Sequence, residues 1–135
     1  MNGSQSLEGL LDEWYRWVCL SSSDKMDDAK NSDITGYIDF MYLVEDDPET
    51  AWEAILEAID QPRMTPYLGN LAASPLEELL DLHGASFIDR VEQRARSDAK
   101  FARVLGGVWK SAMPESIWQR VQAVWNTEGY DAPAA

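Results

Sequence analysis

The sequence predicts an all-α protein, a single domain of six to seven short helices packed as a compact bundle or a HEAT-like helical stack. Three observations support this fold class. Apolar residues recur at helical spacing in most segments, proline and capping residues mark several helix starts, and no segment shows strand alternation of comparable strength. A length of 135 residues suits one domain with one core, spanning residues 1–135.

The first two helices are predicted on either side of a polar loop. Ser6 is a candidate N-cap for a helix whose apolar face is Leu7, Leu10, Leu11, Trp14 and Val18. Residues 21–33 are almost entirely polar and predict a mobile loop, and residues 1–6 and 127–135 predict flexible ends. Helical spacing then resumes, although the aromatic and β-branched content leaves a strand open, at Ile34, Tyr37, Ile38, Met41 and Tyr42.

The clearest helix lies in DPETAWEAILEAID. Asp47 suits the N-cap and Pro48 the first helical position. One apolar stripe follows, formed by Ala51, Trp52, Ile55, Leu56 and Ile59. Pro62 ends this helix, and the segment 63–71 stays ambiguous because Pro66 interrupts it.

The segment SPLEELLDLHG contains His83, the only histidine in the chain. Ser74 as N-cap, Pro75 at N1 and Glu77 at N3 predict a capping box with a proline start. Gly84 suits the left-handed C′ position, which places His83 near the free carbonyls of the last turn. The buried side is expected to be Leu76, Leu79, Leu80 and Leu82.

A second helix is expected to follow so soon that the two form a tight helical hairpin. Its inward residues are predicted to be Phe87, Ile88, Val91 and Ala95, with Glu92 and Arg96 as an i,i+4 ion pair. Helical spacing continues at Phe101, Val104, Leu105, Val108 and Trp109. The pair Gly106–Gly107 within this pattern indicates a helix break or a close approach by another helix. A last helix is expected from Pro114, with Ile117, Trp118, Val121, Val124 and Trp125 inward.

The net charge of −13 is concentrated in the first half of the chain. Residues 1–61 hold 15 acidic and 3 basic residues, whereas residues 62–135 hold 9 and 8. Such a field opposes direct binding to nucleic acids and to anionic membranes, and it favours a basic protein partner or serves solubility. A single cysteine, the absence of a secretory signal and the absence of a long apolar run together predict a reduced, cytoplasmic protein without a disulfide.

The sequence offers little catalytic or metal-binding chemistry. Leu80 stands three residues before His83, so the Glu-x-x-His arrangement of di-iron bundles is missing. No phosphate-binding loop and no calcium-binding loop is present. A helix-turn-helix reading, with Arg90, Arg94 and Arg96 on the second helix, is opposed by the overall charge. We therefore expect no catalytic residue, no metal and no cofactor.

One pattern of acidic residues is not required for folding. Acids repeat at i,i+4 along the best helix and continue on both sides of it, with no lysine or arginine between Lys30 and Arg63. We call this group the acidic ridge: Glu45, Asp46, Asp47, Glu49, Glu53, Glu57 and Asp60. It is either a solvated face that aids solubility or a surface that steers a basic partner. Tyr15 and Trp17 are candidate aromatic anchors for the same partner.

Three phrases of the sequence resemble a family of uncharacterised bacterial helical domains. They are the Asp-Pro…Ala-Trp motif (Asp47, Pro48, Ala51, Trp52), the Pro-Leu-Glu…Leu-Leu…His-Gly motif (Pro75, Leu76, Glu77, Leu79, Leu80, His83, Gly84) and the segment Leu105–Trp109. The resemblance covers roughly residues 34–125 and leaves 1–33 without a counterpart. It implies a bacterial, cytoplasmic protein and supplies no activity.

Together these observations predict a non-catalytic, acidic protein-binding module. Its more specific form is an inhibitor of the immunity-protein kind, which blocks a basic, nucleic-acid-handling partner by presenting acids where phosphates would bind. The alternative is an adaptor or regulatory domain that binds through an apolar groove of the helical stack. An enzyme using His83 ranks last. The oligomeric state stays open.

Overall fold

The computed structural model describes residues 7–21 and 35–127, and within these ranges the chain forms helices and no strand. The α-helices are α1 (Leu7–Ser21), α2 (Thr35–Asp46), α3 (Pro48–Asp60), α4 (Leu68–Leu71), α5 (Glu77–Ser97), α6 (Ala99–Leu105) and α7 (Glu115–Val124). A 3₁₀ helix, Pro62–Tyr67, precedes α4, and a π-helical turn, Ala72–Leu76, links α4 to α5. The prediction of a compact all-α protein is confirmed. Apart from Thr127 and from Ser21, which ends α1, the predicted flexible ends and the predicted loop 21–33 lie outside the described residues.

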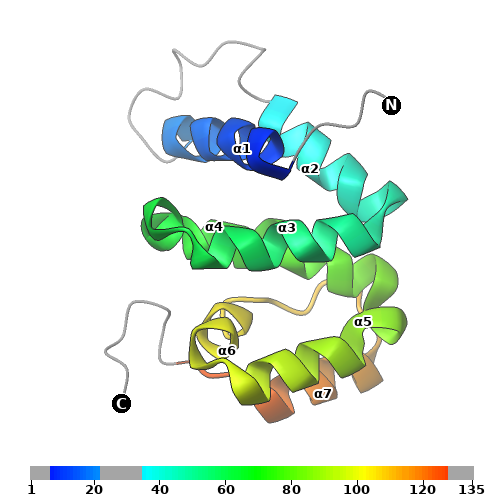
Figure 1. Ribbon diagram of the computed structural model, residues 1–135. Helices are drawn as coiled ribbons and strands as arrows, with labels where there is room; N and C mark the ends of the chain where they lie inside the picture. Colours follow the sequence, from blue (N-terminus) through cyan, green and yellow to red (C-terminus); the bar gives the residue numbers. More distant parts are fainter. Residues whose placement is uncertain (1–6, 22–34, 128–135) are drawn as a thin grey trace.

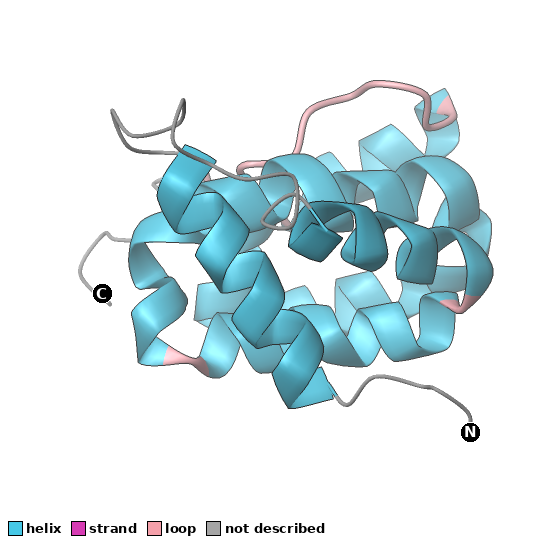
Figure 2. Cartoon of the chain, turned by 90° about the horizontal axis from the view of Figure 1, so that it is seen from above, coloured by secondary structure: helices cyan, strands magenta, loops and turns pink. Residues whose placement is uncertain are grey.

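The helices are stacked in tiers (Figure 1). α1 packs on α2, α3 and α4 lie below them, and the second half of α5 forms a lower tier with α6 and α7. The buried apolar side chains of all these tiers form one continuous core. The longest connection among the described residues, 106–114, joins α6 to α7 (Figure 2).

α1 and α2 cross at very short range. A Cβ added at Gly36 would overlap the backbone of Glu13, so only glycine permits this approach. The buried face of α2 is Gly36, Phe40 and Val44. The segment is thus a helix, as favoured, but the predicted apolar face was wrong: Tyr42 is 61% exposed, and Phe40, fully buried, packs edge-on against Trp14.

The same crossing brings two carboxyl groups together. Asp39 of α2 hydrogen-bonds Glu13 of α1, and partial burial, with the Glu13 charge second, raises the pKa of Asp39. The Oε2 atom of Glu13 is buried and has no hydrogen-bond partner. The surroundings of Asp39 therefore favour its protonated carboxyl, which can donate to Glu13.

Asp39→Asn is expected to stabilise the fold at neutral pH. Because the folded-state pKa of Asp39 lies above its unfolded value of about 3.9, the pair stabilises the fold fully below that value and loses this contribution as pH rises through the raised pKa. An asparagine amide donates to Glu13 without a proton from solvent. Urea unfolding at pH 7 should show a gain that shrinks at pH 4, whereas Asp46→Asn, at an exposed position, should show neither effect. An equal gain at both pH values would contradict this account.

The start of α3 follows the sequence prediction. The Asp47 carboxylate accepts hydrogen bonds from the Thr50 backbone N–H at 3.3 Å and from the Thr50 hydroxyl at 2.7 Å. Pro48 occupies the first turn, where no intrahelical donor is needed. The predicted stripe is buried except for Leu56, which is half-buried, and Ala54 and Ala58 join it.

The predicted helix start at Ser74 was wrong. The chain is already helical from Leu68, and it passes Pro75 in the π-helical turn. Proline in a regular α-helix clashes with the carbonyl four residues earlier, and the wider π turn relieves that clash. Ser74 accordingly caps nothing: its hydroxyl contacts Met41 Sδ at 3.7 Å. The Glu77 carboxylate instead accepts from the Trp109 backbone N–H.

The predicted meeting of two helices at this point is confirmed, because α5 consists of two helical stretches that join across a kink at His83 (φ −132°, ψ 22°). Gly84 does not take the left-handed conformation predicted for it; a Cβ there would lie 3.0 Å from Ile117 Cγ2, so this glycine lets α7 approach. Leu82, on the outside of the kink, is 50% exposed rather than buried.

His83 has a structural partner on α2. Its Nε2 lies 2.9 Å from the Val44 carbonyl and donates to it. In a continuing helix that carbonyl would accept from residue 48, but Pro48 has no N–H. His83 thus satisfies a carbonyl at the end of α2, whereas the sequence predicted a role at the end of its own helix.

The connection after α6 confirms the predicted break at the glycine pair. α6 ends at Leu105, and a Cβ on Gly106 would overlap the backbone of Asn126. The Asn126 N–H donates to the Ala102 carbonyl at 2.9 Å. The chain therefore returns after α7 to pack against bare glycine backbone, and this close approach comes from an extended segment rather than a helix.

Two further side-chain predictions were wrong in this region. Trp109 was expected in the core and is 74% exposed. Glu92 was expected to pair with Arg96, but it forms a two-bond contact with Arg120 of α7, which also binds Asp89. Bonding to Arg120 holds the pKa of Glu92 below its usual value.

Candidate functional site

The acidic ridge lies on the solvent side of the molecule. Glu49, Glu53, Glu57 and Asp60 share the face of α3 opposite its buried residues, and Glu45 and Asp46 end α2. All seven ridge residues are exposed. The structure therefore places the whole predicted group where a partner can reach it.

Two ridge carboxylates already have partners. Asp47 caps α3, and Glu49 binds Arg90 of α5 through two bonds of 2.7 and 2.8 Å. This bonding to Arg90 holds the pKa of Glu49 below its usual value. The sequence reasoning missed this pair because the base lies 41 residues away. Glu53, Glu57 and Asp60 carry no ion pair with any described residue.

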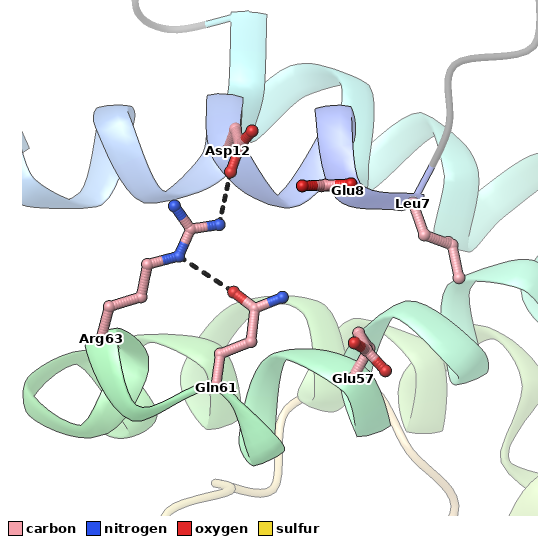
Figure 3. Close-up of a pocket in the computed structure, with 6 residues that line it drawn as sticks. All are labelled: Leu7, Glu8, Asp12, Glu57, Gln61 and Arg63. Carbon is pink, nitrogen blue, oxygen red and sulfur yellow. Dashed lines mark hydrogen bonds and ion pairs between the residues drawn. The ribbon is translucent and has the colours of Figure 1, made fainter.

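The ridge borders a groove between α1 and α3 (Figure 3). The groove has a volume of about 630 Å³ and is lined by Leu7, Glu8, Asp12, Glu57, Gln61 and Arg63. Arg63 bridges it by donating to Asp12 of α1 and, at 2.9 Å, to Gln61. Glu8 and Glu57 have no cationic partner among the described residues, so the groove keeps an excess of negative charge.

Glu8 and Asp12 were not predicted as site residues. They lie one helical turn apart on α1, and the structure sets them across the groove from α3. The signal in the sequence is their i,i+4 spacing on the polar side of the first helix. It could not show which other helix they face.

The two predicted aromatic anchors are half-buried. Tyr15 packs edge-on against Tyr67 at 5.8 Å, and Arg63 lies over its ring at 4.8 Å. The hydroxyls of Tyr15 and Tyr67 both hydrogen-bond the Cys19 thiol, and this bonding raises the pKa of each tyrosine hydroxyl. Through Arg63, Tyr15 adjoins the groove, and it lines a neighbouring cavity of about 560 Å³.

Trp17 packs on Tyr37, with 4.7 Å between ring centroids. It lines neither of these two cavities. The structure thus associates Tyr15 with the acidic groove and does not associate Trp17 with it.

The described residues were also searched for metal sites and membrane-spanning helices. Within 7–21 and 35–127, no group of three or more His, Cys, Asp or Glu side chains is placed to hold a metal ion. No helix in the same ranges is both long and apolar enough to cross a membrane. His83 lies at the α2–α5 contact, away from the groove residues.

Comparison with known proteins gives one finding. A search of curated proteins and a search of solved structures each produced no match. A family model matches residues 24–129, which takes in every described helix except α1. α1, which supplies Glu8 and Asp12 to the groove, therefore lies outside the matched region. The chain belongs to the family of unknown function DUF6869.

Proposed function

We propose that this protein is a non-catalytic cytoplasmic module that binds a basic protein through its acidic face, as an inhibitor of the immunity-protein kind. The acidic face consists of the groove acids Glu8 and Glu57 with the neighbouring ridge acids Glu53 and Asp60. The observation that carries the proposal is that no described cation neutralises these four carboxylates. None has an ion pair with a described residue, although other acids of the same surface do.

The chemistry of the acidic face supports a partner rich in lysine and arginine. A protein that handles nucleic acid binds phosphates through such cations. Carboxylates held along a rigid helix can pair with the same cationic side chains and so prevent the nucleic acid from binding to them. The single cysteine, which excludes an intrachain disulfide, is consistent with a reducing compartment.

The experiment first captures a partner and then measures how tightly it binds. The immobilised full-length protein is incubated with lysate of the source cell, eluted in rising salt, and the eluted protein is identified by mass. Glu53→Gln/Glu57→Gln is expected to weaken that protein's binding about tenfold and to flatten its salt dependence, because each exposed ion pair contributes about 0.2–1 kcal/mol. Glu78→Gln/Glu115→Gln, which removes the same charge outside the acidic face, should leave the affinity unchanged.

The alternative is an adaptor that binds through an apolar surface, and the exposed indole of Trp109 favours it. The same experiment separates the two functions. A partner that survives high salt and binds both double variants equally well would refute the acidic inhibitor and support the adaptor.

A further inference from the structure

A separate concave surface lies at the junction of α6 and α7, in the tier farthest from α1 (Figure 1). Its volume is about 360 Å³, and it is lined by Gly106, Val108, Trp109, Lys110, Trp118 and Trp125. We call it the tryptophan pocket. Trp118 and Trp125 meet nearly at right angles (84°) with ring centroids 5.2 Å apart, so together they form an aromatic corner. Neither the acidic ridge nor the acidic groove shares a residue with it.

The backbone that carries Trp109 is held firmly. The Trp109 N–H donates to Glu77 at 3.0 Å, and the Ala112 N–H donates to Asp81 at 3.2 Å. Burial raises the pKa of both carboxyls, while these backbone hydrogen bonds lower it. Two partly desolvated acids thus fix the loop, yet they leave the Trp109 indole in solvent. A large aromatic side chain on a fixed backbone is preorganised for contact, since little entropy is lost on binding.

The polar side-chain groups that the described residues bring to the tryptophan pocket are all donors. The described lining residues provide three indole N–H groups and the Lys110 ammonium, and none of their side chains carries an acceptor. None of the three indole N–H groups donates to an acceptor within the described residues. In a chain with a net charge of −13, the one charged side chain that lines this pocket from the described residues is a lysine. Through Lys110 and the indole N–H groups, it therefore complements an apolar ligand that bears acceptors and negative charge.

We propose that the tryptophan pocket binds an extended peptide segment of a partner protein, at a proline or aromatic residue adjacent to an aspartate or glutamate. The ring enters the corner of Trp118 and Trp125, the peptide carbonyls accept from indole N–H groups, and the acidic side chain pairs with Lys110. Aromatic-lined grooves recognise extended proline-containing segments in this way. A volume of about 360 Å³ stands at the small end of ligand pockets, which suits one or two side chains. This binding is independent of the acidic face.

The test uses synthetic decapeptides centred on proline or tryptophan, each made with Asp, Asn or Lys at the adjacent position. Binding to the full-length ¹⁵N-labelled protein is followed through the six tryptophan indole signals, assigned with single Trp→Phe variants. Asp peptides should bind more tightly than Lys peptides and should shift the Trp109, Trp118 and Trp125 signals. The signals of buried Trp14 and Trp52 should stay in place.

Variants then test the assigned contacts. Lys110→Glu should weaken the Asp peptides about tenfold and remove the preference over Lys peptides, since it replaces attraction by repulsion. Lys100→Glu makes the same charge change outside the pocket and should have no effect. Trp109→Ala should weaken binding at least about tenfold while the circular dichroism stays unchanged. The proposal is overturned if no pocket indole shifts at millimolar peptide, or if Lys peptides bind as well as Asp peptides.

Discussion

Gly36→Ala is expected to force α1 away from α2 and to destabilise the protein by about 3 kcal/mol or more. The added methyl group would overlap the backbone oxygen, the carbonyl carbon of Glu13 and the backbone nitrogen of Trp14. Backbone cannot rotate aside as a side chain can, so the two helices must separate. Separation would loosen fully buried Trp14 and Phe40, whose rings pack across this crossing.

Urea unfolding followed by tryptophan fluorescence measures this loss. Gly84→Ala is the matched control, because there the methyl group meets only the side chain of Ile117, at 3.0 Å, and alanine gains about 1 kcal/mol of helix propensity. We expect Gly84→Ala to change stability by less than about 1 kcal/mol. Equal losses at the two positions would contradict the close α1–α2 crossing.

Trp52→Ala is expected to destabilise the protein by about 3–5 kcal/mol. Trp52 is buried on α3 and packs against Phe87 of α5 at 6.0 Å and Phe101 of α6 at 5.6 Å. Its removal leaves a cavity where three helices meet. Since a domain has only about 5–15 kcal/mol of total stability, this single change approaches unfolding.

Trp109→Ala is the control for Trp52→Ala. Its indole is 74% exposed, so its removal should change the free energy of unfolding by less than about 0.5 kcal/mol. Thermal unfolding of the two variants side by side checks both values. A large loss for Trp109→Ala would mean that the indole supports the fold, and it would remove the reason for assigning it to binding.

The acidic site was predictable in part. The periodic acids of α3 could be recognised because i,i+4 spacing is a local property of the chain. Their pairing state could not, since Arg90 reaches Glu49 across 41 positions. The groove itself depends on Asp12 and Arg63, 51 positions apart, and on Glu8, which no local pattern connects to α3. The two predicted aromatic anchors also differ in outcome: Tyr15 adjoins the groove, whereas Trp17 does not.

The proline positions show the limit of local rules most clearly. Pro48 and Pro75 both resemble helix starts in the sequence, and only Pro48 is one. At Pro48 the preceding Asp47 side chain caps the new helix. At Pro75 a π turn carries the helix past the proline, and burial of Pro75 and Leu76 in the core holds this turn in place.

The sequence by itself determined the all-α class, the buried faces of α1 and α3, the cap at Asp47 and the break at Gly106, because each follows from residues within one or two turns. The tertiary structure alone decided the partner of His83, the exposure of Trp109 and the α1–α3 groove. These depend on contacts between distant segments, such as His83 with the Val44 carbonyl and Glu77 with the Trp109 N–H. Such contacts form because buried polar groups need hydrogen-bond partners in the assembled core. The spacing of residues within one segment does not show which distant group will be the partner.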